Sequence, residues 1–284
     1  MKTGLIMEGG AMRGLFTAGI TDVLMEHNIT FDGAVGVSAG AAFGCNYKSM
    51  QIGRALRYNK TYCRDKRYCS LHSLLTTGNL YGADFCYREI PEKLDIFDYD
   101  TFCKNPMEFY VVCTDVLTGK AVYKKLENEG QSLVCEWIRA SASLPLVSRI
   151  VEIDGLKLSD GGTADSVPIR FFESIGYTKN VVILTREKGY CKKASKMTDM
   201  IMKLCLPKYP KLAEAIKNRT EMYNETLRYI SQKEEKGEVF VFRPSEALPI
   251  ERIEKNPDKL QEAYDIGRAL ATEKLSELKE FLAK

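Results

Sequence analysis

Continuous apolar runs, separated by helical stretches, recur through residues 4–186 of the chain. We expect strands at residues 4–7, 33–37, 107–113 and 181–185, each bounded by turn residues. Runs of this kind are typical of strands that are buried on both faces, as in a parallel sheet. The intervening stretches repeat apolar residues at helical spacing. The pattern predicts an α/β fold in which helices cover a largely parallel sheet.

Two hairpins are expected within this sheet. Residues 122–123 follow a Leu-Thr-Gly turn and pair back on the strand at 107–113. Residues 150–153 and 156–158 form a second hairpin around Asp154-Gly155, a dipeptide that favours a tight turn. These short antiparallel elements add to the parallel strands.

The C-terminal region predicts a last strand at residues 239–242 and an amphipathic helix from Pro257 onward. No Ser/Gly-rich or proline-rich stretch separates it from the rest. With 284 residues, 45% hydrophobic and 28% charged, the composition excludes disorder, collagen and coiled coil. We expect one domain with a helical tail.

Charge and cysteine content exclude several classes of function. The 41 Lys and Arg residues against 38 acids give a net charge of +3, too small for a dedicated nucleic-acid binder. Ten of these cations against three acids fall in residues 186–219, which predicts one basic surface of local charge +7. Nine cysteines without a Cys-x-x-Cys pair indicate thiols that are mostly buried, in a cytoplasmic protein. The chain has two histidines, and we expect neither a metal nor a cofactor. From the residues at the N-terminus we expect neither a signal peptide nor a membrane span.

The most specific motif is Gly36-Val37-Ser38-Ala39-Gly40. It follows a predicted strand and precedes a helix of small residues, which is the context of a nucleophile elbow. The strained turn needs small neighbours two residues to either side, here Gly36 and Gly40, and Ser38 is the candidate nucleophile. The alternative is a chance Gly-x-Ser-x-Gly in a tight turn.

A serine nucleophile needs an adjacent base. No histidine follows His72, so the order Ser, acid, His of the α/β-hydrolases is unavailable. Asp160, which two glycines follow after a short strand, is the candidate base. Two alternatives stay open: His72 as the base from another loop, and Asp160 as a turn residue of the same kind as Asp154.

Glu8-Gly9-Gly10-Ala11-Met12-Arg13-Gly14 lies between the first strand and its helix. Amides at such a helix N-terminus bind an anion. A dinucleotide pyrophosphate would indicate an oxidoreductase, but Ala11 breaks the Gly-x-Gly-x-x-Gly pattern. The oxyanion of an acyl-transfer intermediate fits a chain that also has a serine elbow.

These three motifs, in this order, resemble those of the patatin-like phospholipases, above all the bacterial members. Residues 140–145, Ala-Ser-Ala-Ser-Leu-Pro, also resemble a family segment ahead of the aspartate. The resemblance covers residues 4 to about 186. It implies a three-layer sandwich with a largely parallel central sheet. Residues 1–186 would form the catalytic domain, and residues 187–284 a packed extension with a basic helical segment, a short strand and a final helix.

The resemblance implies a serine acyl hydrolase that cleaves phospholipid or acylglycerol esters. Ser38 would be the nucleophile and Asp160 its base in a dyad. The implied oxyanion hole comprises Gly9, Gly10 and Ala11. Arg13 and Gly14 belong to the loop that supports it. Where the family commonly has glycine this chain has Ala11, whose methyl group would cost about 1 kcal/mol at a positive φ. A non-catalytic lipid-binding or regulatory member of the fold is therefore the alternative.

The basic segment at residues 192–217 predicts a peripheral contact with an anionic membrane. Met197, Met200, Ile201 and Leu204 fall at helical spacing among lysines. The alternative is that these apolar residues pack on the sheet while the lysines are solvated.

Overall fold

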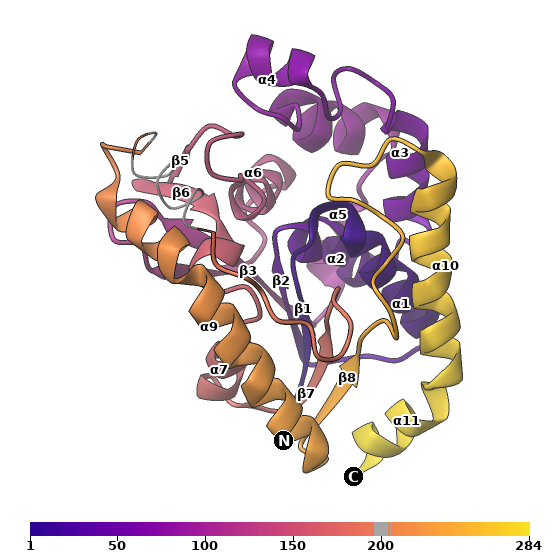
Figure 1. The fold of residues 1–284 in the computed structure, drawn as a ribbon. Coiled ribbons are helices and arrows are strands. Elements are labelled where there is room, and N and C mark those ends of the chain that lie inside the picture. Colours follow the sequence, from indigo (N-terminus) through magenta and orange to yellow (C-terminus); the bar gives the residue numbers. More distant parts are fainter. Residues whose placement is uncertain (196–203, 205) are drawn as a thin grey trace.

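The computed structural model describes residues 1–195, 204 and 206–284 (Figure 1). Within these residues one sheet has the strand order β5-β6-β3-β2-β1-β7-β8, and β4 pairs with β3. The strands are β1 (Lys2–Met7), β2 (Gly33–Val37), β3 (Glu108–Asp115), β4 (Ala121–Leu126), β5 (Val151–Ile153), β6 (Leu156–Asp160), β7 (Tyr177–Ile183) and β8 (Val239–Phe242). The predicted strands and both predicted hairpins are confirmed.

The centre of the sheet is parallel, from β3 through β2, β1 and β7 to β8. β1 shows why its apolar run belongs there. Leu5, Ile6 and Met7 are fully buried, with Leu5 and Met7 in one apolar cluster and Ile6 in the other. Both faces of the strand are thus covered, as the continuous apolar pattern requires.

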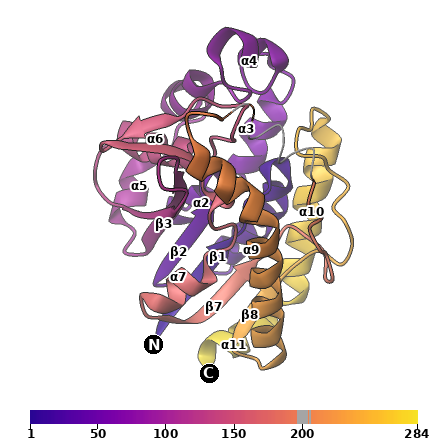
Figure 2. The ribbon, with the colours of Figure 1, turned by 60° about the vertical axis from the view of Figure 1, so that its left-hand side comes forward.

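Helices form the two outer layers. They are α1 (Gly14–Glu26), α2 (Ala39–Lys48), α3 (Arg54–Tyr62), α4 (Leu71–Thr77), the π-helix η2 (Phe85–Leu94), α5 (Tyr99–Lys104), α6 (Gln131–Ser141), α7 (Ile169–Ser174), α9 (Pro210–Glu235), α10 (Pro257–Glu273) and α11 (Leu275–Ala283). The turns η1 (Ala11–Arg13) and η3 (Gly161–Thr163) are 3-10 helices. In Figures 1 and 2, α7 and α9 lie on one side of the sheet, and α1, α2 and α10 on the other. The predicted three-layer α/β sandwich is confirmed.

The helix predicted from Pro257 onward is divided into α10 and α11, and α10 packs closely on α1. A Cβ on Gly267 of α10 would lie 2.1 Å from the carbonyl oxygen of Phe16, and one on Gly19 of α1 would lie 2.1 Å from that of Tyr264. Both positions therefore need glycine for the two backbones to approach. Since β8 also pairs with β7, the C-terminal region shares the sheet and the core with the rest. The boundary between residues 186 and 187 stays a prediction.

Most of the predicted lipid-facing stripe lies outside the described residues, including Met197, Met200 and Ile201. Leu204 is described, and 73% of its surface is exposed. No helix among the described residues has the length and apolar character that crossing a membrane requires.

Candidate active site

Ser38 lies on the sharp turn from β2 into α2, with φ +54° and ψ −119°. This is a strained conformation for a residue with a side chain. The flanking glycines permit the turn, because a Cβ on Gly36 would lie 2.4 Å from the Gly40 carbonyl oxygen. A Cβ on Gly40 would lie 2.3 Å from the carbonyl oxygen of Met7. The geometry is that of a nucleophile elbow.

Asp160 ends β6 opposite Cys113 and is 2% exposed. Its Oδ1 accepts a hydrogen bond of 2.8 Å from the Gly162 amide. Burial raises the pKa of the carboxyl group, while the Arg219 charge and the Ser38 hydroxyl counteract that rise. Among the described residues, Oδ2 has no hydrogen-bond partner of standard geometry. Ser38 and Asp160 border one cavity, and one oxygen of the carboxylate has no partner among the described residues.

Residues 140–145 accept hydrogen bonds from the backbone of both Ser38 and Asp160. The Ser38 amide donates to Ser141 Oγ at 2.9 Å, and that hydroxyl donates to the Val112 carbonyl at 2.6 Å. Two residues on, the Ser143 carbonyl accepts from the Asp160 amide at 2.8 Å. One helix end thus fixes the backbone at both residues.

The glycine-rich loop lies over the elbow. A Cβ on Gly9 would lie 2.7 Å from the Val37 carbonyl oxygen and 3.0 Å from the Ser38 Cβ. Across residues 1–195, 204 and 206–284, the amides of Gly9 and Gly10 donate to no other group. Ala11 has a φ of +50°, in the left-handed region that favours glycine. The loop therefore offers donors beside Ser38, and it contains the strain anticipated for alanine.

Glu8 and Arg13 lie toward the two ends of this loop, and hydrogen bonds hold the Glu8 side chain. Glu8 is buried, and its carboxylate accepts from the Thr185 amide at 2.6 Å and from the Tyr223 hydroxyl at 2.6 Å. Arg13 is 8% exposed, and burial together with the Arg186 charge lowers the pKa of its guanidinium. Gly14 starts α1, where a Cβ would lie 2.8 Å from the Phe43 ring.

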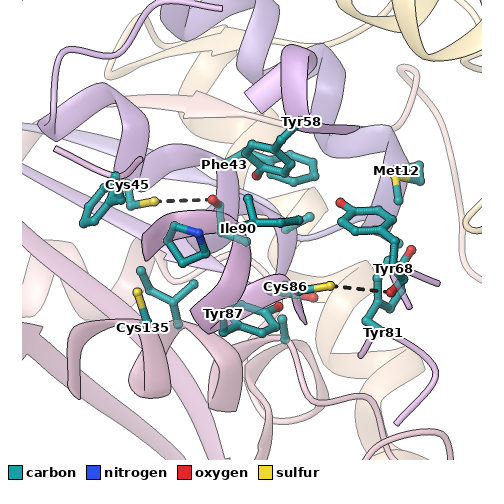
Figure 3. A pocket seen from close by; sticks show the side chains of 18 of the residues that line it. Met12, Phe43, Cys45, Tyr58, Tyr68, Tyr81, Cys86, Tyr87, Ile90 and Cys135 are labelled. Carbon is teal, nitrogen blue, oxygen red and sulfur yellow. Dashed lines mark hydrogen bonds between the residues drawn. The ribbon is translucent and has the colours of Figure 1, made fainter. Parts of the chain in front are cut away.

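Two cavities meet at Ser38. One is mainly apolar and lies among helices α2, α3 and α6 and the π-helix η2; its residues include Phe43, Tyr58, Tyr68, Tyr81, Tyr87 and Ile90 (Figure 3). The other, which we call the polar cavity, is lined by Asp160, the glycine-rich loop and further charged side chains. Ala11, Ser38 and Leu144 line both.

Five cationic side chains line the polar cavity: Arg13, Arg186, Lys192, Arg219 and Arg252. Motif reasoning identified Arg13 alone among them as a site residue. The excess of positive charge in residues 186–219 is the sequence signal for three others. Lys192 was assigned to a membrane-facing surface, yet it lies half-buried in this cavity.

His72 lies elsewhere. It is exposed on α4 and lines neither cavity. Asp154 occupies the β5–β6 turn with a φ of +50°, as expected for a tight hairpin. The structure brings Asp160 to Ser38 and leaves His72 and Asp154 out of the site.

Fold and site together define a class: α/β sandwiches with a serine on a strand-to-helix elbow beside an aspartate and a glycine-rich loop. The chain belongs to the patatin-like phospholipase family, whose sequence profile matches residues 5–172. A second profile, a domain of unknown function (DUF6363), matches residues 209–283.

Two relatives and one solved structure illustrate the similarity to known proteins. The chain is 26% identical to the uncharacterized protein YjjU of Escherichia coli K12 over 94% of its own length and 75% of that protein. It is 24% identical to the uncharacterized NTE family protein Rv1063c of Mycobacterium tuberculosis H37Rv, over 59% of its own length and 44% of the relative. The crystal structure of VipD from Legionella pneumophila aligns with a TM-score of 0.49 and 11% identity, covering 97% of this chain and 67% of that one.

Proposed function

We propose that the protein hydrolyses the carboxylic ester of a lipid, a phospholipid or an acylglycerol. The observation that carries this proposal is the position of Ser38, at the junction between an apolar cavity and a polar cavity that contains Asp160. An acyl chain fits the first cavity and a polar head group the second. Membership of the patatin-like phospholipase family supports a lipid hydrolase.

In the proposed reaction, Oδ2 of Asp160 takes the Ser38 proton while Oγ bonds to the ester carbonyl carbon. The raised pKa of Asp160 makes its carboxylate a stronger base than an ordinary aspartate. The negative charge that develops on the carbonyl oxygen is held by the amides of Gly9, Gly10 and Ala11, at the N-terminal end of α1.

Collapse of this intermediate breaks the bond to the leaving alcohol, which receives the proton from Asp160. An acyl group then remains on Ser38. Water attacks the acyl carbon, its proton passes to Asp160 and then to Ser38, and a fatty acid is released. The cycle consumes one water and restores both side chains.

A non-catalytic lipid-binding protein is the second candidate, because the left-handed backbone at Ala11 strains the loop. Labelling with a serine-directed phosphonate separates the two candidates. We expect covalent modification at Ser38, which needs an activated hydroxyl. An unlabelled but folded protein that binds lipid would favour the second candidate.

Ser38→Ala and Asp160→Asn should each lower ester turnover by about a thousandfold or more, without loss of the fold. The double variant should be no worse than the single ones, because nucleophile and base act as a unit. Fatty acid released from a mixed lipid extract, measured by mass spectrometry, gives the activity, and circular dichroism checks the fold.

The matched control is His72→Ala, which should keep turnover within about twofold of the wild type. Near-normal turnover in Asp160→Asn would contradict the dyad. A loss in His72→Ala as deep as that in Ser38→Ala would instead indicate a histidine mechanism.

We also propose that the enzyme meets its substrate at a membrane surface through the basic segment 192–217, except for Lys192, whose side chain lines the polar cavity. The cytoplasmic location stays a prediction from the cysteine content.

A further inference from the structure

The cations of the polar cavity come from distant parts of the chain. Arg13 belongs to the glycine-rich loop, and Arg186 and Lys192 follow β7. Arg219 comes from α9, and Arg252 from the segment before α10. The last two lie in the region that matches the domain of unknown function. The C-terminal region therefore completes the wall of the cavity that contains the dyad.

Among the described residues, few acids lie near these charges. Glu8 and Asp160 are the two carboxylates that line the cavity, against five cations. Both oxygens of Glu8 are already used, by Thr185 and by the Tyr223 hydroxyl. In the described part of the chain, none of the five cations forms an ion pair within 4 Å.

Two of the guanidinium groups also have unused donors. Nε of Arg13 and Nε of Arg219 are buried, with no hydrogen-bond partner among the described residues. Arg13 is more than nine-tenths buried and lines the cavity. A buried guanidinium nitrogen without a partner is costly unless an acceptor fills the site. Phosphate oxygens are the acceptors that clustered arginines bind best.

The aromatic walls disfavour a positively charged head group. Arg186 stacks on the Tyr190 ring at 4.5 Å, and Lys192 lies over the Tyr223 ring at 5.5 Å. A choline or ethanolamine ammonium is usually bound by free aromatic faces or by a carboxylate. Here a cation of the protein already lies against each of these two rings, and Glu8, the acid besides Asp160 among the described lining residues, is buried and hydrogen-bonded.

We infer that this cavity is a specificity subsite for a lipid phosphate whose substituent carries no positive charge. In this arrangement Arg219 and Arg252 of the C-terminal region bind the phosphate with Arg13, while the acyl chain occupies the apolar cavity. The inference rests on the proposed function for the position of the ester bond. It assigns the C-terminal region a role in substrate selection: anionic head groups bind, and zwitterionic ones are disfavoured.

Binding rather than turnover tests this inference, because Arg219 also acts electrostatically on Asp160. The probes are three soluble lipids with one octanoyl chain: acylglycerol 3-phosphate, acylglycerophosphocholine and monoacylglycerol. Their affinities for the full-length Ser38→Ala protein are measured by calorimetry. We expect the phosphate lipid to bind at least about tenfold more tightly than either of the others.

In the same background, Arg219→Gln and Arg252→Gln should each weaken binding of the phosphate lipid about tenfold. Both should leave the affinity for monoacylglycerol within about twofold. The matched control is Arg228→Gln, on the same helix as Arg219 but exposed and outside the polar cavity. It should change none of the three affinities.

Equal affinities for the phosphate and choline lipids would overturn the inference. An equal loss of affinity for all three lipids in Arg219→Gln would also overturn it, because that result indicates a structural role. A matching loss of affinity in Arg228→Gln would do the same, because that result indicates an effect of general surface charge. Inorganic phosphate is the fourth probe. If it binds as tightly as the phosphate lipid, the cavity is a site for a small phosphate compound and not for a lipid.

Turnover of the same lipids by the wild-type protein separates this inference from the proposed function. Selective binding without hydrolysis would retain the subsite and refute the hydrolase. Hydrolysis of all three lipids at similar kcat/KM would retain the hydrolase and refute the subsite.

Discussion

Ala11 combines a site role with backbone strain. Its φ of +50° costs an alanine about 1 kcal/mol relative to glycine, and the residue lines both cavities beside Ser38. Ala11→Gly relieves that strain and keeps the amide. We expect the variant to preserve or raise kcat by up to a few fold, measured on a soluble ester. A large fall in kcat with an unchanged melting temperature would contradict the proposed oxyanion loop.

The proposed subsite should have a pH dependence that comes from Lys192. Burial, with the charges of Arg219 and Arg252, lowers its pKa to about 7, while Glu8 acts in the opposite direction and Arg13 in the same one. The ammonium is therefore present below pH 7 and lost above it. For a lipid phosphodiester with an uncharged substituent, whose phosphate stays ionised, kcat/KM should fall about three- to tenfold from pH 6 to pH 8 relative to a neutral ester.

Taking the ratio of the two substrates cancels the titration of Asp160, which both require. Lys192→Arg keeps the charge over this range and should give a flat ratio. A flat ratio in the wild type, or the same slope in Lys192→Arg, would remove Lys192 from the subsite.

The sequence singled out the candidate residues that belong to a local motif. Ser38 and Asp160 each lie within two residues of the glycines that their turns require, so a short window contains the signal. Arg219 and Arg252 have no such window, because folding alone brings them beside residues about two hundred positions earlier. The regional excess of charge in residues 186–219 includes Arg219, whereas no signal in the sequence pointed to Arg252.

At the scale of elements, continuous apolar runs predicted the strands well, because nearly all residues of a strand that is buried on both faces are apolar. The long helix α9 was harder to foresee. Its buried residues are few for a 26-residue helix: Leu212, Tyr223, Thr226 and Ile230. A helix that touches the sheet along one narrow side carries a weak apolar periodicity. The same helix places Arg219 in the polar cavity. The weak apolar periodicity of α9 therefore explains why the sequence predicted neither the helix nor the position of Arg219.

The docking of α10 on α1 likewise depends on features that periodicity does not show. Gly19 and Gly267 were unremarkable within their helical patterns, yet each accommodates a carbonyl group of the other helix. The Arg268 guanidinium meets the Glu26 carboxylate at 2.8 Å on the exposed side of this contact. The close backbone approach at these two glycines therefore contributes to the position of α10.

For the whole molecule, one buried carboxyl group connects the N-terminal and C-terminal parts. Asp22 Oδ2 on α1 accepts from the Gly53 amide at 2.8 Å and from the Tyr264 hydroxyl at 2.6 Å. Burial is the main cause that raises the pKa of Asp22 to about 6. An unfolded aspartate titrates near 3.9. The folded state therefore binds the proton more tightly between these two values.

It follows that Asp22 stabilises the folded state most below about pH 4, and that this contribution is lost as the pH rises through 6. A shift of about two pKa units corresponds to about 3 kcal/mol at most. The variant Asp22→Asn has no titrating group at this position. Its free energy of unfolding minus that of the wild type should therefore rise by about 2 kcal/mol between pH 4.5 and pH 7.5. Urea unfolding of both proteins across this range measures the difference, which cancels the other carboxyl groups. Asp265→Asn, an exposed position on α10, is the control and should show no such change. A constant difference between Asp22→Asn and the wild type would mean that Asp22 is ionised throughout, and that its hydrogen bonds to Gly53 and Tyr264 offset the cost of burying the charge.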